Sequence, residues 1–179
     1  MTTQIDLEVE FPHLAARNRW GPITNEFRLG LFPPDELISN VSIVPFCDDK
    51  LVVLRLENGR HEPPGGTREP NEAWIDTLRR ELVEEAGAEL RSFSYVGSWK
   101  WTTTAAQPYR PHLPYPTGYR VVGFGEISIT GEPTNPAGGE QVAAVELLSL
   151  DEAVDRFLTG NCPDLADLYR LADQIRRGR

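Results

Sequence analysis

The sequence contains few cysteines and no long apolar run. Its only cysteines, Cys47 and Cys162, form no Cys-x-x-Cys pair and have no histidine pair nearby. This usage argues against a disulfide framework and a zinc site, and it predicts a location in a reducing cytoplasm. No apolar segment approaches the roughly 20 residues of a bilayer-spanning helix. The acidic start, residues 1–10, lacks the apolar core of a secretory signal.

Positive charge is also scarce. The chain has 18 Lys and Arg residues against 27 Asp and Glu residues, which gives a net charge of −9 with neutral histidines. So acidic a surface repels polyanions, which argues against binding to a nucleic-acid polymer or an anionic membrane. Small phosphorylated ligands stay possible where metal cations or a local basic patch screen the repulsion. A length of 179 residues, 40% of them hydrophobic, predicts one packed domain.

The chain divides into a short extension and a domain. Residues 1–24 contain helix and strand breakers and predict an irregular N-terminal extension, and residues 25–179 predict the domain. A short strand is expected at residues 26–31. Residues 41–47 and 51–57 predict a β-hairpin, whose first strand should lie at a sheet edge or carry a bulge because Pro45 lacks an N–H group.

A strong amphipathic helix is expected after the hairpin, with Asn71 as its cap and Gly87 at its end. Three further strands follow at residues 92–101, 119–130 and 142–148, and four prolines mark the loop 102–118. Ser149 and Glu152 form a capping box before a first C-terminal helix, and an apolar stripe over residues 165–175 predicts a second. Strands mixed with helices at both ends indicate an α/β/α sandwich around a mixed β-sheet.

Carboxylates converge on one face of the expected central helix. Glu81, Glu84 and Glu85 stand at positions i, i+3 and i+4, so they lie within roughly 5–6 Å of one another, Cβ to Cβ. Their mutual repulsion is relieved by a hard cation, and Mg²⁺ and Mn²⁺ prefer such oxygen ligands and bridge to phosphates. The alternative for this face is a solvated acidic surface without a metal.

The whole segment decides between these alternatives. Residues 66–88 read GTREPNEAWIDTLRRELVEEAGA and resemble the Nudix box, G-x5-E-x7-R-E-U-x-E-E-x-G-U, at all seven fixed positions. Such a match arises by chance about once in 10⁸ windows at ordinary residue frequencies. Leu82 fills the first aliphatic slot, whereas Ala88 is smaller than the usual last residue. The preceding Pro64-Gly65-Gly66 also resembles the family's lead-in.

The resemblance implies a Nudix hydrolase that cleaves a nucleoside diphosphate linked to another moiety. It implies that Glu81, Glu84 and Glu85 bind Mg²⁺ or Mn²⁺, and that one of them can also act as the general base. It further implies that Arg80 orients a box glutamate and that Glu72 supports this charge network. Glu140, on a loop before a strand, corresponds to a further metal-binding or basic glutamate in many family members, with a solvated loop acid as the alternative.

A cationic, aromatic segment precedes the last strand. Residues 91–125 contain no Asp or Glu, and such a segment in an acidic protein suits a pocket for a base and phosphates. The candidates for substrate binding in and beside the loop are Trp101, Tyr109, Arg110, His112, Tyr115 and Arg120.

Two other classes of function stay open at this stage. One is a Nudix-fold nucleotide-binding or regulatory module without turnover, and the other is an acidic scaffold without a metal. The intact box argues against the first, and titration with divalent metal discriminates the second. The expected partner is a small-molecule nucleotide, and the family resemblance makes a homodimer plausible.

Overall fold

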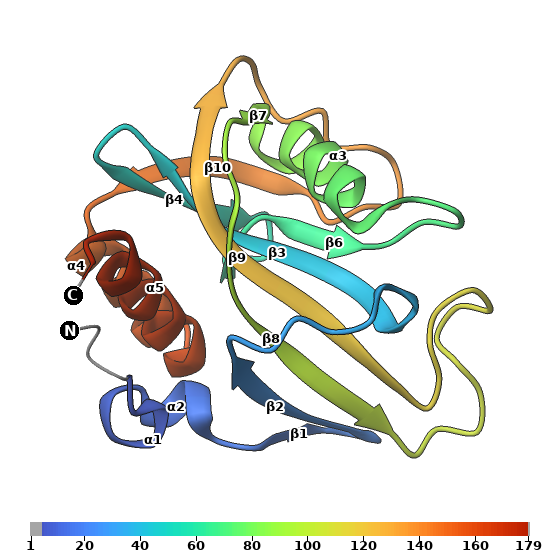
Figure 1. Ribbon diagram of the computed structural model, residues 1–179. Coiled ribbons are helices and arrows are strands. Elements are labelled where there is room, and N and C mark those ends of the chain that lie inside the picture. The colour runs from blue at the N-terminus through green and yellow to red at the C-terminus, as the bar shows by residue number, and fades with distance from the viewer. Residues whose placement is uncertain (1–4, 179) are drawn as a thin grey trace.

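The computed structural model describes residues 5–178. Its centre is a large mixed β-sheet whose main path runs β1-β2-β8-β9-β3-β4-β10, with β5, β6 and β7 paired beside it (Figure 1). The pair β3·β9 is parallel and the other described pairs are antiparallel. The strands are β1 (Asn18–Trp20), β2 (Ile23–Leu29), β3 (Ile38–Cys47), β4 (Lys50–Leu56), β5 (His61–Glu62), β6 (Gly65–Thr67), β7 (Ala88–Leu90), β8 (Ser94–Thr103), β9 (Thr117–Ile129) and β10 (Val142–Leu148).

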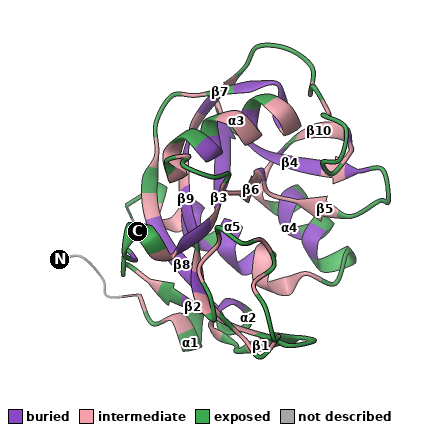
Figure 2. Cartoon of the chain, turned by 90° about the vertical axis from the view of Figure 1, so that its right-hand side faces the viewer, coloured by how far each residue is buried: buried purple, intermediate pink, exposed green. Residues whose placement is uncertain are grey.

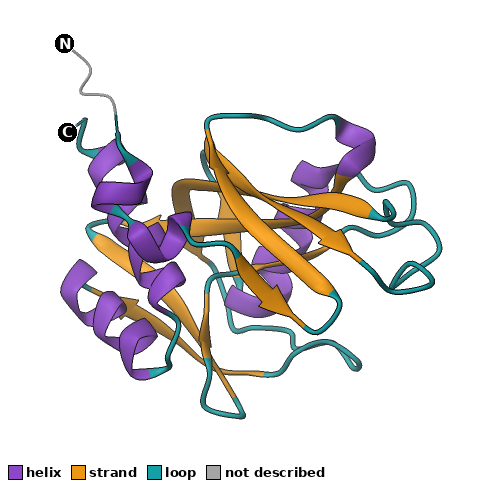
Figure 3. Cartoon of the chain, turned by 90° about the horizontal axis from the view of Figure 1, so that it is seen from below, coloured by secondary structure: helices purple, strands orange, loops and turns teal. Residues whose placement is uncertain are grey.

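Helices cover both faces of this sheet, which confirms the expected α/β/α sandwich (Figure 3). Helix α3 (Trp74–Ala86) packs on one face over a core that includes Val52, Leu54 and Leu82. The other core includes Val53 and Phe157 and lies under the N-terminal and C-terminal helices, and buried residues concentrate in these two layers (Figure 2). The remaining helices are α1 (Leu7–Glu10), α2 (Pro12–Ala15), α4 (Leu150–Thr159), α5 (Pro163–Arg176) and the 3₁₀ helix η1 (Asp35–Leu37).

The N-terminal segment is more ordered than the sequence predicts. Residues 1–4 of the expected extension and Arg179 of the expected domain lie outside the described residues, but α1, α2 and β1 fill most of residues 7–20, where irregular chain was expected. Leu14 is 1% exposed within the core. Asp167 of α5 accepts hydrogen bonds from the backbone N–H groups of His13 (2.9 Å) and Leu14 (3.4 Å). Short helices that local propensity does not predict form here because tertiary packing stabilises them.

The predicted hairpin is present, and its first strand carries a register shift rather than lying at a sheet edge. β3 lies between β9 and β4 in the interior of the sheet, and its register shift falls between Ile38 and Asn40 rather than at Pro45. β3 pairs with β6 over residues 40–42 and with β4 only at Phe46 and Cys47. Pro45 therefore falls where β3 has diverged from both of these neighbours, and its missing N–H interrupts neither ladder.

The C-terminal helices follow the sequence pattern closely. Ser149 and Glu152 form the predicted capping box at the start of α4. In α5, Leu168 and Ala172 are buried, and the hydroxyl of the buried Tyr169 donates to the Val52 carbonyl at 2.9 Å. Within residues 5–178, no helix is long and apolar enough to cross a membrane.

Candidate active site

The acidic residues of helix α3 lie beside Gly65 and Gly66, in the segment that precedes the helix. Leu78, Leu82 and Ala86 are buried as the sequence predicts. Gly87 ends the helix in the left-handed conformation, with φ of 57°. The sequence predicted Asn71 as the N-cap of this helix, and that prediction is wrong. The helix begins at Trp74, with Ala73 at the N-cap position. Asn71 has a positive φ of 63°. Asn71 instead turns the chain before the helix, a conformation that Asn tolerates better than most residues.

Arg80 joins the carboxylates of this helix into one network. Its Nε donates to Glu72 Oε1 at 2.9 Å, and its Nη1 donates to Glu81 Oε1 at 2.8 Å and to Glu84 Oε2 at 3.2 Å. Nη2 reaches the Thr67 carbonyl at 3.2 Å. One half-buried guanidinium therefore ties three glutamates to the loop that enters the helix.

Glu72 is the carboxylate that this network holds most strongly in its charged form. Burial alone would raise its pKa, but hydrogen bonds from Arg80, the Glu69 N–H and the Thr77 hydroxyl lower the pKa to about 2. The Glu72 hydrogen bond in turn raises the pKa of Arg80, against the effect of desolvation. Both members of the pair are therefore ionised at neutral pH.

Gly65 and Gly66 allow the loop to approach the helix closely. Gly65 donates its N–H to Glu85 Oε2 at 3.0 Å, and its φ of +152° places it in a region that favours glycine. A Cβ on Gly66 would lie 2.0 Å from Glu81 Oε1. The two glycines thus give two carboxylates their positions, one by a hydrogen bond and one by the absence of a side chain.

Glu85 has the most perturbed pKa of the group. Desolvation by burial raises the pKa to about 8, the Gly65 N–H opposes the rise, and the charges of Glu81, Glu140 and Glu84 add to it. Desolvation also raises the pKa of Glu81, against the effect of Arg80. Glu140 itself is exposed, yet it lies close enough for its charge to act on Glu85.

The glutamates of α3 are of the right type to bind a hard divalent cation. Arg80 now occupies one oxygen of Glu81 and one of Glu84. Within residues 5–178, no group of three or more His, Cys, Asp or Glu side chains is arranged to hold a metal ion as it stands. The reason lies in the contacts above, because Glu81 and Glu84 turn toward Arg80. The donor set is nonetheless all carboxylate, which suits Mg²⁺ or Mn²⁺, and a cation would relieve the repulsion acting on Glu85.

The long loop between β8 and β9 folds back onto the entrance of α3. Arg110 Nη1 pairs with Glu69 Oε1 at 2.9 Å, and His112 Nε2 lies 2.8 Å from the Arg68 carbonyl. Tyr115 donates its hydroxyl to the Ala105 carbonyl at 2.8 Å within the loop. Residues 68–69 are part of the box segment, so two of the predicted substrate residues tie their loop to it.

The other predicted substrate residues have different surroundings. Tyr109 is 84% exposed, whereas Trp101 is half-buried and donates from Nε1 to Ser39 Oγ at 2.8 Å. Arg120 is exposed, and desolvation by the surrounding protein lowers its pKa, opposed by the charges of Glu140 and Glu85.

The sequence pattern missed some of these contacts. Glu69 was not a candidate, although it anchors Arg110 across 41 positions of the chain. Gly65 was noted only as part of a lead-in, and its N–H now holds Glu85. Glu126 of β9 accepts hydrogen bonds from Arg176 of α5 at 3.1 and 2.8 Å, and it therefore joins two distant elements rather than the site.

Comparisons with known proteins agree with this geometry. A sequence model of the NUDIX domain family matches residues 36–171. A mutant of the Bacillus subtilis pyrophosphohydrolase BsRppH has a similar structure, at 16% identity over 76% of this chain and 91% of that chain, with a TM-score of 0.55. A NUDIX hydrolase from Nitrosomonas europaea is similar at 20% identity over 75% and 90%, with a TM-score of 0.54. These likenesses show a shared fold. A comparison with curated proteins found no match.

Proposed function

The chain belongs to the NUDIX domain family of pyrophosphohydrolases, and we propose that it cleaves the diphosphate bond of a nucleoside diphosphate linked to another moiety. Mg²⁺ or Mn²⁺ would be the cofactor. The observation that carries the proposal is the convergence of the acidic face of α3 on the Gly65-Gly66 loop. There, Glu85 bonds to Gly65 and Glu81 packs against Gly66.

Each residue of the box would have a defined task. Glu81, Glu84 and Glu85 would hold the cation, which, when bound, neutralises the diphosphate and activates water for attack on phosphorus. Arg80 and Glu72 would keep these carboxylates in position before the cation binds. Glu85 or Glu140 would serve as the general base.

The β8–β9 loop would determine which nucleotide is bound. Its contacts with Arg68 and Glu69 place it against the box segment. Tyr109, Tyr115 and Trp101 would offer ring surfaces to a base, and His112 and Arg120 would contribute donors near the phosphates. Arg110 would hold the loop in place through its pair with Glu69. The two free thiols, Cys47 and Cys162, support a cytoplasmic location. The expected homodimer stays a prediction.

A panel of nucleotide substrates tests the proposal. Purified protein would be incubated with nucleoside diphosphate sugars, dinucleoside polyphosphates and nucleoside triphosphates, each with Mg²⁺, Mn²⁺ or EDTA, and products would be identified by chromatography. We expect metal-dependent cleavage between two phosphates of at least one substrate, abolished by EDTA and strongly reduced in Glu85→Gln. Metal binding in calorimetry without cleavage of any substrate would instead support the binding module, and no metal binding would support the acidic scaffold.

A further inference from the structure

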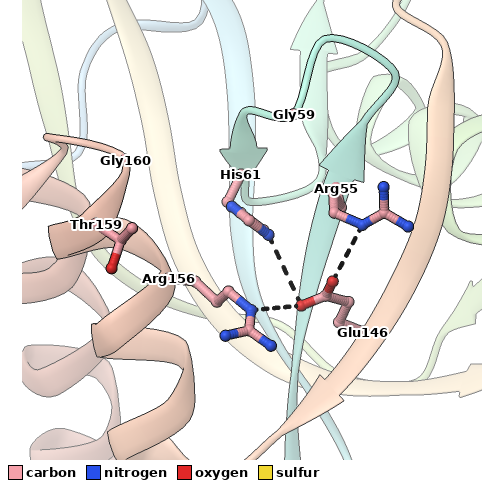
Figure 4. Close-up of a pocket in the computed structure, with 7 residues that line it drawn as sticks. All are labelled: Arg55, Gly59, His61, Glu146, Arg156, Thr159 and Gly160. Atoms are coloured by element: carbon pink, nitrogen blue, oxygen red, sulfur yellow. Dashed lines mark hydrogen bonds and ion pairs between the residues drawn. The ribbon is translucent and has the colours of Figure 1, made fainter.

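A second cluster of charged residues surrounds a cavity formed by β4, β5, β10 and α4 (Figure 4). Its centre is Glu146 of β10, which faces three cationic or titratable groups from three other elements. Arg156 Nε lies 3.0 Å from Glu146 Oε2, Arg55 Nε lies 3.3 Å from Oε1, and His61 Nε2 lies 3.8 Å from Oε2. None of these residues belongs to the box.

Both arginines use only part of their hydrogen-bonding capacity. Arg55 and Arg156 each contact Glu146 through Nε, and across residues 5–178 neither terminal Nη group has a protein partner. Two guanidinium groups against one carboxylate also leave an excess of one positive charge in a protein of net charge −9. The Glu146 side chain is 19% exposed, whereas the arginines are 43% and 45% exposed. The carboxylate is thus the inner anchor between the two arginines, whose Nη groups point away from it (Figure 4).

The cavity has room for a small ligand beside these donors. Its volume is about 410 Å³, and Glu146 is its only acidic lining residue. Gly59 and Gly160 add no side chains to its wall. The end of α4 contributes little opposing charge, because its carbonyls at residues 156, 157 and 158 already accept N–H groups from residues 160, 162 and 161.

We propose that this cavity is a binding site for a phosphate group, either inorganic phosphate or the phosphate monoester of a small molecule. The free Nη groups of Arg55 and Arg156 would bind its oxygens in the forked arrangement that guanidinium groups favour. Glu146 holds both side chains in place before the ligand arrives, which reduces the entropy lost on binding. The proposal does not rest on the proposed hydrolysis, because it concerns residues outside the box.

Titration calorimetry in EDTA tests this site without contribution from divalent metals. Inorganic phosphate and glycerol phosphate would be titrated in separate arms at constant ionic strength. We expect saturable binding to one site, and the tighter of the two arms identifies the source of the phosphate. Arg55→Gln and Arg156→Gln should each weaken binding about tenfold or more, the effect of losing charge-assisted hydrogen bonds. Arg28→Gln is the matched control, because Arg28 is also 43% exposed and paired with one glutamate, Glu26.

Two further variants make the result decisive. Arg156→Lys keeps the charge and loses the fork, so binding should be weakened but retained even where a Gln variant folds poorly by circular dichroism. Arg79→Gln, which removes the same charge from an exposed arginine outside the cavity, should bind phosphate as the unchanged protein does. Equal affinity in the wild type and in all three Arg55 and Arg156 variants would overturn the proposal. So would an equal loss of affinity in Arg79→Gln, or heats no larger than those from sodium chloride.

Discussion

The Glu81 carboxylate occupies the space that a side chain at Gly66 would fill. A Cβ on Gly66 would lie 2.0 Å from Glu81 Oε1 and 2.3 Å from Cδ. Arg80 Nη1 holds the same oxygen from the other side at 2.8 Å. The first fixed glycine of the box is therefore required by a carboxylate 15 positions later, and not only by the turn it forms.

Gly66→Ala should consequently reduce activity more than stability. Its backbone has an ordinary φ, so alanine fits the chain but displaces the Glu81 carboxylate. We expect kcat to fall at least tenfold while the thermal midpoint changes by a few degrees. Gly131→Ala is the control, because a Cβ there meets nothing within 4 Å and kcat should be unchanged. Equal kcat in both variants would show that the position of Glu81 is not important for turnover.

Glu85→Gln should separate catalysis from stability. The substitution keeps the shape but removes a charged ligand, so kcat with Mg²⁺ or Mn²⁺ should fall at least ~10²-fold. Without metal, the free energy of unfolding should hold or rise, because a buried and repelled charge has been removed. Steady-state kinetics and urea unfolding in EDTA measure the two effects. Glu89→Gln, at an exposed glutamate paired with Arg91, should leave both nearly unchanged.

The stability of the metal-free protein should depend on pH in the direction set by Glu85. Its pKa is raised to about 8 in the folded state, so between about pH 4.5 and 8 the folded chain binds more protons than the unfolded chain. The free energy of unfolding therefore falls as pH rises through this window. We would measure urea unfolding in EDTA at pH 5, 6, 7 and 8. The free energy of unfolding of Glu85→Gln should increase relative to that of the wild type at each step. A constant difference would contradict the assignment.

Glu72 should change the free energy of unfolding with pH in the direction opposite to Glu85, and it should do so at acid pH. Its pKa of about 2 in the folded state lies below the ordinary value, so its contribution is present above about pH 4.5 and is lost as pH falls toward 2. Glu72→Gln should lower the free energy of unfolding at pH 7 by roughly 1 to 3 kcal/mol. At pH 2.5 the difference between the wild type and the variant should shrink to about a quarter of its value at pH 7. A difference that stays the same at both pH values would mean that packing, not charge, is responsible.

Arg110 was predicted to bind substrate, but its contact with Glu69 indicates a role in positioning the loop. With its Nη1 held at 2.9 Å from Glu69, the arginine can act on substrate by positioning the loop. Arg110→Ala and Glu69→Gln should then raise KM to a similar extent, and the double variant should be no worse than either single variant. Additive effects in this double-mutant cycle would indicate that Arg110 contacts the substrate directly. Arg79→Ala, at an exposed arginine paired with Asp76, is the control.

The N-terminal segment should prove to be part of the domain. Leu14 is buried against α5, so Leu14→Ala should lower the free energy of unfolding by about 2 to 5 kcal/mol. Val9→Ala, at a side chain that is 75% exposed, should change it by less than about 0.5 kcal/mol. Chemical unfolding of both variants measures this. A neutral Leu14→Ala would instead support the division at residue 25 that the sequence predicts.

Local sequence determined the helix of the box and the chemistry of its side chains. The spacing of Glu81, Glu84 and Glu85 places three carboxylates on one side of a helix whatever surrounds it, because helical periodicity depends only on neighbours in the chain. The capping box at Ser149 and the end of α3 at Gly87 are local in the same sense. These features were therefore predictable from the sequence.

Tertiary structure decided which distant groups meet these residues. Asp167 holds the segment around His13 from 154 positions away, and Arg110 finds Glu69 across the loop. Arg55, Glu146 and Arg156 come together around the cavity from three separate elements. No periodicity in the sequence encodes such pairs, because strand order and loop paths bring them together. The sequence by itself thus determined the reactive groups, and the fold determined their partners.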